Sequence, residues 1–251
     1  MTGPRLGLQL YTVRNAPLPL PELLHAVAAA GYEGVETVGT QGVAPDVLRA
    51  ALADAGLAIA SAHVPLSELR ADPDAAIAAH VALGTPLLVV PWLAPEDRPA
   101  DLAGWTALGA ELDALGARVT DAGLRLAYHH HDFELVRHGD RDGLSALLGA
   151  ADPGRLAVEL DAGWLLAVGE DPVRWLDAWG PRVARLHLKD VDLAQTPPWV
   201  DVGDGILDLA GVLAAAAAHG VAWALVEHDA PADPIATIRR SAAAVRALRP
   251  G

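Results

Sequence analysis

The sequence predicts an α/β fold, a single (β/α)8 TIM barrel spanning residues 1–251, and three observations lead to this prediction. Eight short apolar runs with strand character recur along the chain, and segments with helical spacing lie between them. The length of 251 residues is typical of one such barrel. The first turn lacks the G-x-G-x-x-G fingerprint, so an open nucleotide-binding sheet loses its main support.

The eight predicted strands are often preceded by glycine or a turn and followed by polar residues. They cover residues 6–11, 34–38, 58–63, 87–92, 124–131, 156–161, 183–189 and 222–227. Alternation of strands with helices favours parallel pairing, because a parallel connection needs a crossover that a helix supplies.

The predicted helices carry clear start and stop signals. Three of them begin at an Asp-Pro pair, at residues 72, 171 and 233. Aspartate is a good N-cap, and proline fits the first helical turn because its missing N–H is not needed there. A helix after Pro21 ends at Gly31, and the longest helix covers residues 101–122.

Composition narrows the kinds of function. The chain has no cysteine, which excludes disulfides, thiolate metal sites and a cysteine nucleophile. With 18 Lys and Arg against 32 Asp and Glu, the net charge is −14, which disfavours nucleic acid as a partner. No signal-peptide pattern opens the chain, and the apolar stretch 209–226 is broken by His219-Gly220. We therefore expect a soluble, cytoplasmic protein with no membrane partner.

Polar residues gather where the predicted strands end, which is where barrel enzymes place their catalytic groups. Side chains alternate along a strand, so those of one parity point into the barrel. The expected inward residues near four strand ends are His129, His131, Glu159, Asp161, Arg185, His187, Lys189 and Glu227.

A divalent metal ion would resolve the repulsion among these carboxylates. Asp161, His187 and Glu227 end three successive strands and therefore lie side by side. Oxygen and imidazole ligands fit Mn, Mg, Co, Zn or Fe without choosing among them.

Structural roles compete with this interpretation. A single His or Asp at a strand end is more often a cap or turn residue than a ligand. His130 can face the helices, and Lys189 with Asp190 can form a surface ion pair of little energetic value. The coincidence of three ligand-type residues on neighbouring strands outweighs these alternatives.

Several segments near the predicted strand ends form a characteristic set. They are YHHHDFE (128–134), VELDAGW (158–164), LHLKD (186–190), VGDGILD (202–208) and ALVEHD (224–229), with GLQLYTVR, GYEGVE and SAHVPL earlier in the chain. Together they resemble the sugar phosphate isomerase/epimerase family of the xylose isomerase-like barrel superfamily. The resemblance covers essentially the whole chain. It is specific for fold and superfamily, and much less so for substrate.

In related ketose epimerases a Glu, an Asp, a His and a Glu after strands five to eight hold one divalent metal. The resemblance carries the last three roles to Asp161, His187 and Glu227. For the first ligand the motif offers Glu134, whereas a gapless match offers His129. We take Glu134 as the expected ligand and His129 as its rival. The family usually has Asn where this chain has His130.

The resemblance implies an isomerase or epimerase acting on a sugar, keto-sugar or cyclitol through an ene-diolate intermediate. Glu134 and Glu227 are the expected proton-transfer groups, and His131 is an auxiliary acid or base. The expected substrate-binding residues are Glu36, His63, His129, Lys189 and Trp164.

Other substrate-contacting groups and other reactions stay open. Trp92, Trp164 and Trp199 stand near strand ends, and one of them is expected to support a sugar ring. No arginine cluster marks a phosphate site, which favours an unphosphorylated substrate. The alternatives are a dehydratase or lyase at the same site, an abasic-site endonuclease, and a non-catalytic sugar binder or inactive subunit; a homo-oligomer is compatible with all of them.

Overall fold

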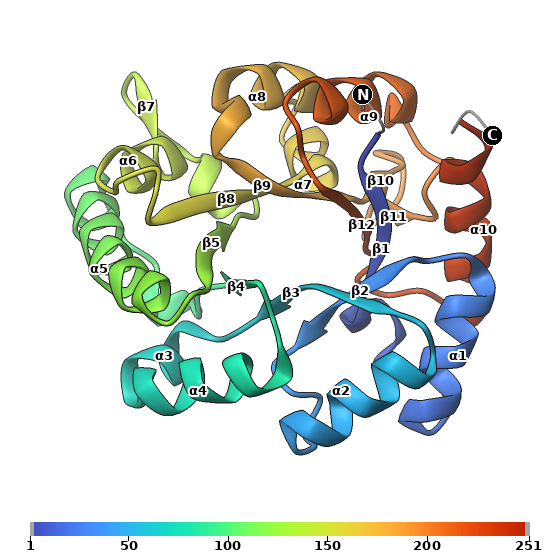
Figure 1. The fold of residues 1–251 in the computed structure, drawn as a ribbon. Helices are drawn as coiled ribbons and strands as arrows, with labels where there is room; N and C mark the ends of the chain where they lie inside the picture. The colour runs from blue at the N-terminus through green and yellow to red at the C-terminus, as the bar shows by residue number, and fades with distance from the viewer. Residues whose placement is uncertain (1–2, 249–251) are drawn as a thin grey trace.

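A closed parallel barrel forms the centre of the computed structural model, which describes residues 3–248 and confirms the predicted fold. Its strands follow one another around the ring in the order β1-β12-β9-β8-β5-β4-β3-β2. Figure 1 shows these strands surrounded by helices. The strands are β1 (Arg5–Gln9), β2 (Gly34–Val38), β3 (Ala58–His63), β4 (Leu87–Val90), β5 (Arg125–His129), β8 (Leu156–Asp161), β9 (Val183–Leu188) and β12 (Trp223–Val226).

The helices pack around the outside of the barrel. They are α1 (Leu20–Ala30), α2 (Pro45–Asp54), α3 (Leu66–Ala71), α4 (Pro73–Leu83), α5 (Leu102–Asp121), α6 (Gly143–Gly149), α7 (Ala162–Ala167), α8 (Pro172–Trp179), α9 (Leu209–Ala218) and α10 (Pro234–Ala247). The three Asp-Pro predictions are confirmed, since Asp72, Asp171 and Asp233 cap α4, α8 and α10 by accepting backbone N–H hydrogen bonds. Gly31 ends α1 in the left-handed conformation that glycine favours, at φ 100°.

Several strands are shorter than predicted, and at the end of β1 a polar side chain turns the chain. Gln9 ends β1 by accepting a hydrogen bond from the N–H of Tyr11, which starts a 3-10 helix over Leu10–Val13. Strand β5 ends at His129, two residues before the predicted boundary. These early ends place the following residues in the loops that form the rim of the barrel.

The two faces of the barrel wall carry different side chains. Outward residues such as Leu126, Tyr128 and Leu160 join the large apolar core shared with the helices. Two separate small clusters, made of residues of the opposite parity, fill the interior. They contain Leu87, Val89, Ala127, Ala157 and Ala184 in one case, and Ala58, Ala60, Trp223 and Leu225 in the other.

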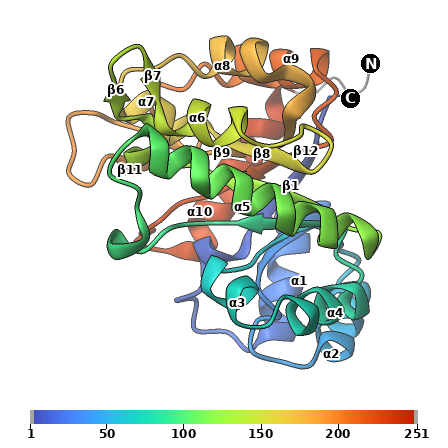
Figure 2. The same ribbon diagram turned by 90° about the vertical axis from the view of Figure 1, so that its left-hand side faces the viewer.

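The carboxyl ends of the parallel strands all open toward one end of the barrel. Two small hairpins lie after strands β5 and β9, β6–β7 (Arg137–His138 and Arg141–Asp142) and β10–β11 (Asp190–Val191 and Trp199–Val200). Figure 2 shows β6, β7 and β11 on the side away from the two termini. Residues at this end come from every part of the chain, so it is where a site can be assembled.

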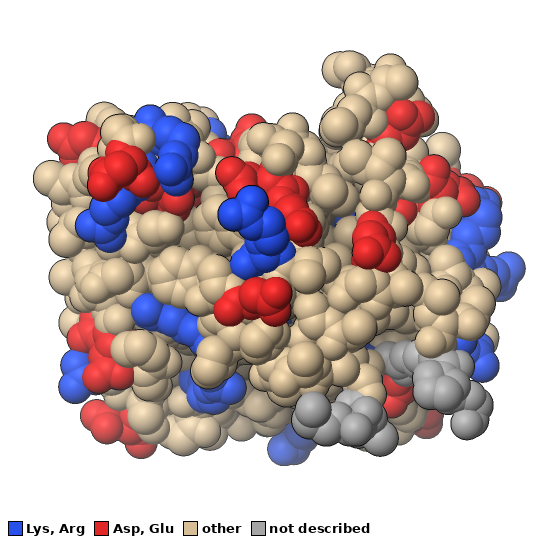
Figure 3. Space-filling view, turned by 90° about the horizontal axis from the view of Figure 1, so that it is seen from above, with Lys and Arg blue, Asp and Glu red and all other residues tan. Residues whose placement is uncertain are grey.

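The surface and the helices give two further facts about the described residues. On the face shown in Figure 3, basic side chains lie interspersed with acidic ones, without a continuous basic surface among the residues described there. Within residues 3–248, the helices are all too short or too polar to cross a membrane.

Candidate active site

Four buried side chains from four neighbouring strands converge at the carboxyl end of the barrel. His129 ends β5, Asp161 ends β8, His187 lies in β9 and Glu227 follows β12. One potential ligand atom from each lies within 4.8 Å of the others. We call His129, Asp161, His187 and Glu227 the outer group. It contains three of the four predicted metal ligands, with His129 in the place expected for Glu134.

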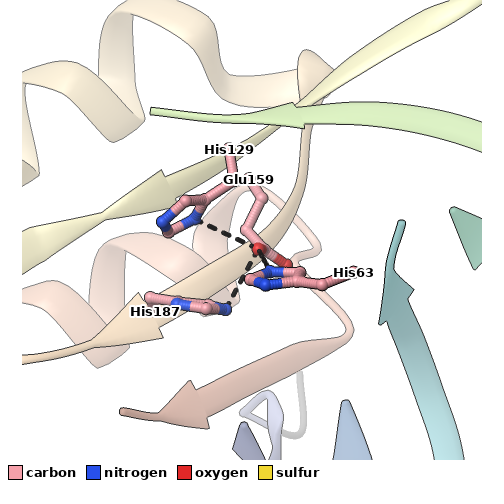
Figure 4. Close-up of side chains that lie close together, drawn as sticks. All are labelled: His63, His129, Glu159 and His187. Atoms are coloured by element: carbon pink, nitrogen blue, oxygen red, sulfur yellow. Dashed lines mark hydrogen bonds and ion pairs between the residues drawn. The ribbon is translucent and has the colours of Figure 1, made fainter. Parts of the chain in front are cut away.

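A second set lies deeper in the barrel, because Glu159 precedes Asp161 by two residues on the same strand. His63, His129, Glu159 and His187 form this inner group, again within 4.8 Å. Figure 4 shows one oxygen of Glu159 facing three imidazoles. Its Oε1 lies 2.9 Å from His63 Nε2, 3.2 Å from His129 Nδ1 and 3.0 Å from His187 Nε2.

His187 connects the two groups through its two ring nitrogens. Its Nδ1 lies 3.1 Å from Glu227 Oε2 and 3.9 Å from Asp161 Oδ2 in the outer group. Its Nε2 lies 2.8 Å from Glu36 Oε2 and 3.0 Å from Glu159 Oε1. A histidine that binds metal through one nitrogen commonly donates its other N–H to a carboxylate, which fixes the ring. Glu36 and Glu159 are therefore placed to orient His187 toward the outer group.

Histidines of the inner group balance the negative charge of Glu159 and of the neighbouring Glu36. Burial alone would raise the pKa of Glu36, but His63 and His187 outweigh it and hold that pKa well below the usual value. Burial lowers the pKa of His63, yet the Glu36 and Glu159 carboxylates raise it to about 9. The pKa of His187 is raised well above its usual value, because Glu159 and Glu227 outweigh the effect of its burial.

The local chain orients Asp161. Its N–H donates to Nε2 of His130 at 3.1 Å, and its Oδ1 accepts from the N–H of Trp164 at 2.9 Å, which caps α7. Its Oδ2 is buried and has no hydrogen-bond partner in the part of the chain that the structure describes. Burial raises the pKa of Asp161 to about 6, although Lys189 and His187 act in the opposite direction. Oδ2 thus lacks a hydrogen bond, and its nearest charged neighbours are Lys189 Nζ at 3.5 Å and His187 Nδ1 at 3.9 Å.

Lys189 is not part of a surface ion pair with Asp190. Its ammonium is buried and lies 2.9 Å from Glu227 Oε2, 2.8 Å from Asp229 Oδ1 and 3.5 Å from Asp161 Oδ2. Its pKa is raised, since these carboxylates outweigh the desolvation that burial imposes. Lys189 therefore supplies positive charge beside two members of the outer group.

Glu134 lies outside both groups. Its Oε1 accepts from the Tyr128 hydroxyl at 2.6 Å, and its Oε2 accepts from the His131 N–H at 2.8 Å. Tyr128 points toward the helices, so these bonds hold Glu134 behind the barrel wall. Burial raises the pKa of Glu134 to about 7, despite the hydrogen bonds from Tyr128 and His131. The structure brings His129, rather than Glu134, to Asp161, His187 and Glu227.

A pocket of about 540 Å³ opens above the outer group. From the predicted site, its lining includes His63, His129, His131, Trp164 and Glu227. The other predicted members are buried and are not among the lining residues; they are Glu36, Glu134, Asp161, His187 and Lys189. His129 and Glu227 belong to the outer group and also line the pocket. The outer group therefore lies at the buried end of the pocket.

His131 lines this pocket. Burial lowers its pKa well below the usual value, and Lys189 adds to that effect. Its Nδ1 is buried without a hydrogen-bond partner among residues 3–248. The ring lies 5.1 Å from that of Trp164, which in turn lies 4.5 Å from the ring of Trp199. His131 thus lines the pocket beside the aromatic rings of Trp164 and Trp199.

Two supporting residues were not included in the predicted site. The sequence placed Glu159 at an inward position, two residues before Asp161, which could have indicated a role in the site. Only the fold shows that three histidines surround it. Asp190 accepts hydrogen bonds from the N–H groups of Gly203, Gly205 and Leu207, which anchors the loop after β11. A Cβ on Gly205 would lie 2.2 Å from the Asp190 carboxylate, so the glycine is required for this contact.

The donor set fits a divalent cation. Imidazole and carboxylate ligands without sulfur suit Mn, Mg, Co, Zn or Fe, and the unsatisfied Oδ2 of Asp161 is a ready ligand atom. A cation would also offset the negative charge of Asp161, Glu227 and Asp229, which Lys189 balances only in part. The buried His/Glu cluster is consistent with a divalent metal site.

Fold and site together define a class of protein, a (β/α)8 barrel with a buried cluster of potential metal ligands at the carboxyl ends of its strands. The sequence pattern of the family described as xylose isomerase-like TIM barrel matches residues 24–248. The chain belongs to this family. The predicted superfamily membership is therefore confirmed.

Individual relatives are more distant. An inosose dehydratase from Lacticaseibacillus casei is 31% identical over 87 residues, which is 35% of this chain and 28% of that protein. The match spans less than a third of the length of this curated relative. A sugar phosphate isomerase/epimerase from Parabacteroides distasonis has a TM-score of 0.82 at 24% identity, covering 97% of this chain and 93% of that one. The 3-keto-D-glucoside 4-epimerase from E. coli has a TM-score of 0.74 at 18% identity, covering 97% and 99%. The two structures share the fold.

Proposed function

We propose that the protein is a divalent-metal-dependent isomerase or epimerase of a sugar, keto-sugar or cyclitol. The observation that carries the proposal is the convergence of His129, Asp161, His187 and Glu227 at the buried end of a pocket. These four residues are the proposed ligands, and His129 takes the role first assigned to Glu134. A family of sugar-converting relatives supports a small sugar-like substrate.

The bound ion would withdraw electrons from a substrate carbonyl and so acidify the neighbouring C–H. The chain itself supplies the groups that move the proton. Glu227 lines the pocket as a carboxylate, because Lys189 and His187 outweigh its burial and hold its pKa well below the usual value. Glu227 is the proposed base, and His131, which also lines the pocket, is the proposed second proton-transfer group.

Several neighbouring residues hold these groups in place. Glu36 and Glu159 accept from His187 and fix its ring, while His130 and the N-terminus of α7 fix Asp161. Glu134 acts through another residue, since it holds the backbone N–H of His131. Its proposed role is therefore positioning. His63 and Trp164 line the pocket and are proposed to contact substrate hydroxyls and a ring face.

A dehydratase of a keto-cyclitol or keto-sugar is the second candidate, favoured by the similarity to inosose dehydratases. Both reactions begin by removing a proton next to a carbonyl. They differ in whether that proton returns to the substrate or a neighbouring hydroxyl leaves. The product distinguishes them, because only the dehydratase forms an unsaturated compound.

The test begins with metal content. The purified protein is loaded with each of Mn, Mg, Co, Zn and Fe, and bound metal is measured by plasma mass spectrometry. We expect one ion per chain, lost in Asp161→Asn and in His187→Gln. Asp74→Asn and His25→Gln are matched controls, since both residues are exposed and lie outside the two groups.

The loaded protein is then incubated with ketoses, 3-keto-sugars and inososes in heavy water. Exchange of a substrate C–H for deuterium, followed by NMR, is the expected result. Unchanged metal content in both outer-group variants would overturn the proposed metal site. Sugar binding without any exchange by the metal-loaded protein would identify a binding protein instead of an enzyme.

A further inference from the structure

The pocket has an outer part that the proposed reaction does not use. Its wall runs from the outer group toward solvent through a series of rings. The His131 ring lies 4.9 Å from that of His129, and the Phe133 ring stacks on His131 at 5.6 Å and 13°. Exposure rises along this wall, from 1% for His129 to 46% for Trp92.

At the outer end, three side chains form a stacked unit, which we call the rim platform. The Arg98 guanidinium carbon lies 3.8 Å from the ring centroid of Phe133 and 5.3 Å from that of Trp92. The Nε of Arg98 donates to the carbonyl of Leu93 at 3.1 Å, which fixes the guanidinium plane. All three platform residues line the pocket.

The rim platform offers both apolar faces and polar groups. The terminal nitrogens of Arg98 make no hydrogen bond or ion pair with residues 3–248, so their N–H groups are available to a ligand. The Asp132 carboxylate also lines this pocket and can accept hydrogen bonds. A pyranose ring needs such a surface, because it has C–H groups on its faces and hydroxyls around its edge.

The pocket is also larger than one sugar ring. A volume of 540 Å³ corresponds to roughly 18 waters at about 30 Å³ each. A hexose has roughly a dozen non-hydrogen atoms, which are bonded and therefore packed more closely than separate waters. One ring at the outer group leaves room for another at the rim platform.

We propose that the substrate is a glycoside with two sugar rings, the reacting ring at the outer group and the second ring on Trp92, Arg98 and Phe133. The inference rests on the proposed function, which places the reacting ring. The rim platform would act on affinity for the second ring and leave the metal and the proton transfer unchanged.

Calorimetric titration of the Mn-loaded protein tests this with three matched pairs. They are methyl β-D-glucoside with cellobiose, methyl α-D-glucoside with maltose, and methyl β-D-galactoside with lactose. We expect the disaccharide of at least one pair to bind about tenfold more tightly, as a well-stacked ring contact allows. Trp92→Ala should remove this advantage, whereas Trp92→Phe, which keeps an aromatic face, should retain it.

Equal affinity within every pair, an advantage that survives Trp92→Ala, or no binding of any probe would each overturn the proposal. Metal content and deuterium exchange are measured on the same samples and report on the proposed function separately. A Trp92-dependent preference for disaccharides in a protein that binds no metal would support the rim platform while refuting the metal site. Because Trp92 is half exposed, its substitution should not prevent folding.

Discussion

Lys189 should stabilise the metal-free protein far more than the metal-loaded protein. Its buried ammonium is in contact with Glu227 and Asp229, and Asp161 lies 3.5 Å away. Lys189→Met keeps a long side chain but removes the charge. Glu227, Asp229 and Asp161 then lose this cation, and only His187 remains beside two of them unless a divalent ion offsets their charge.

The distances give the size of the effect. At an effective dielectric constant of about 20, unit charges 2.9 Å apart attract by about 6 kcal/mol, from which the cost of desolvation is subtracted. Removing one partner of a buried ion pair typically costs about 3–5 kcal/mol. For a chain of this size, that corresponds to a decrease in Tm of roughly 6–20 °C. With metal bound at Asp161 and Glu227, we expect less than about half of this loss.

Urea unfolding followed by tryptophan fluorescence, with and without saturating Mn, measures both losses. Arg118→Met is the control, because it removes a cation from an exposed pair with Asp74 and such pairs contribute about 0–1 kcal/mol. An equal decrease in the free energy of unfolding with and without metal would refute the idea that the ion and Lys189 balance the same carboxylates. A metal-free Lys189→Met protein as stable as the wild type would refute the ion pairs themselves.

Three further predictions concern pH and the loop after β11. Metal affinity, measured by competition with a chelator, should fall steadily as the pH drops from 8 to 5. His187, whose pKa is raised well above its usual value, must lose its proton to bind, and below about pH 6 Asp161 is protonated as well. An affinity independent of pH over this range would contradict these ligands. Burial lowers the pKa of His80 to about 4. As the pH falls below about 6.5, the unfolded chain therefore binds a proton at His80 before the folded protein does, which lowers the free energy of unfolding. His80→Leu should remove up to about 3 kcal/mol of this loss between pH 6.5 and 4. Outside this pH range, the free energies of unfolding of the wild type and of His80→Leu should depend on pH in the same way. The same pH dependence in both proteins between pH 6.5 and 4 would contradict the lowered pKa of His80. Asp190→Ala removes the acceptor for Gly205 and its neighbours, so amide exchange of residues 203–207 should accelerate by at least about tenfold, which corresponds to a loss of about 1–3 kcal/mol; unchanged exchange would mean that other contacts hold the loop.

Much of the fold was predictable because its signals are local. Capping by Asp72, Asp171 and Asp233 depends on residues two or three positions away, and all three helix starts were predicted correctly. The strand ends were less accurate, since Gln9 ends β1 through its own side chain. The prediction of a single domain over residues 1–251 stays a prediction.

Site residues were predictable only where the alternation of side chains along a strand was enough to show which of them point into the barrel. Asp161, His187 and Glu227 end successive strands, and the structure brings them together as expected. Glu134 follows the strand in a short 3-10 helix, Phe133–Leu135, where the alternation of strand side chains no longer applies. There the Tyr128 hydroxyl and the His131 N–H decided its orientation, and His129 took the place expected for it.

The sequence by itself determined the barrel, the absence of thiol chemistry and the carboxylate and imidazole character of the site, because these follow from periodicity and composition. Only the tertiary structure decided which of those groups meet. Glu36, His63 and Glu159 lie on strands that are distant in the chain, and their contacts with His187 depend on the closure and register of the barrel. The same holds for Lys189, which is buried among carboxylates because the barrel brings the ends of β8, β9 and β12 together.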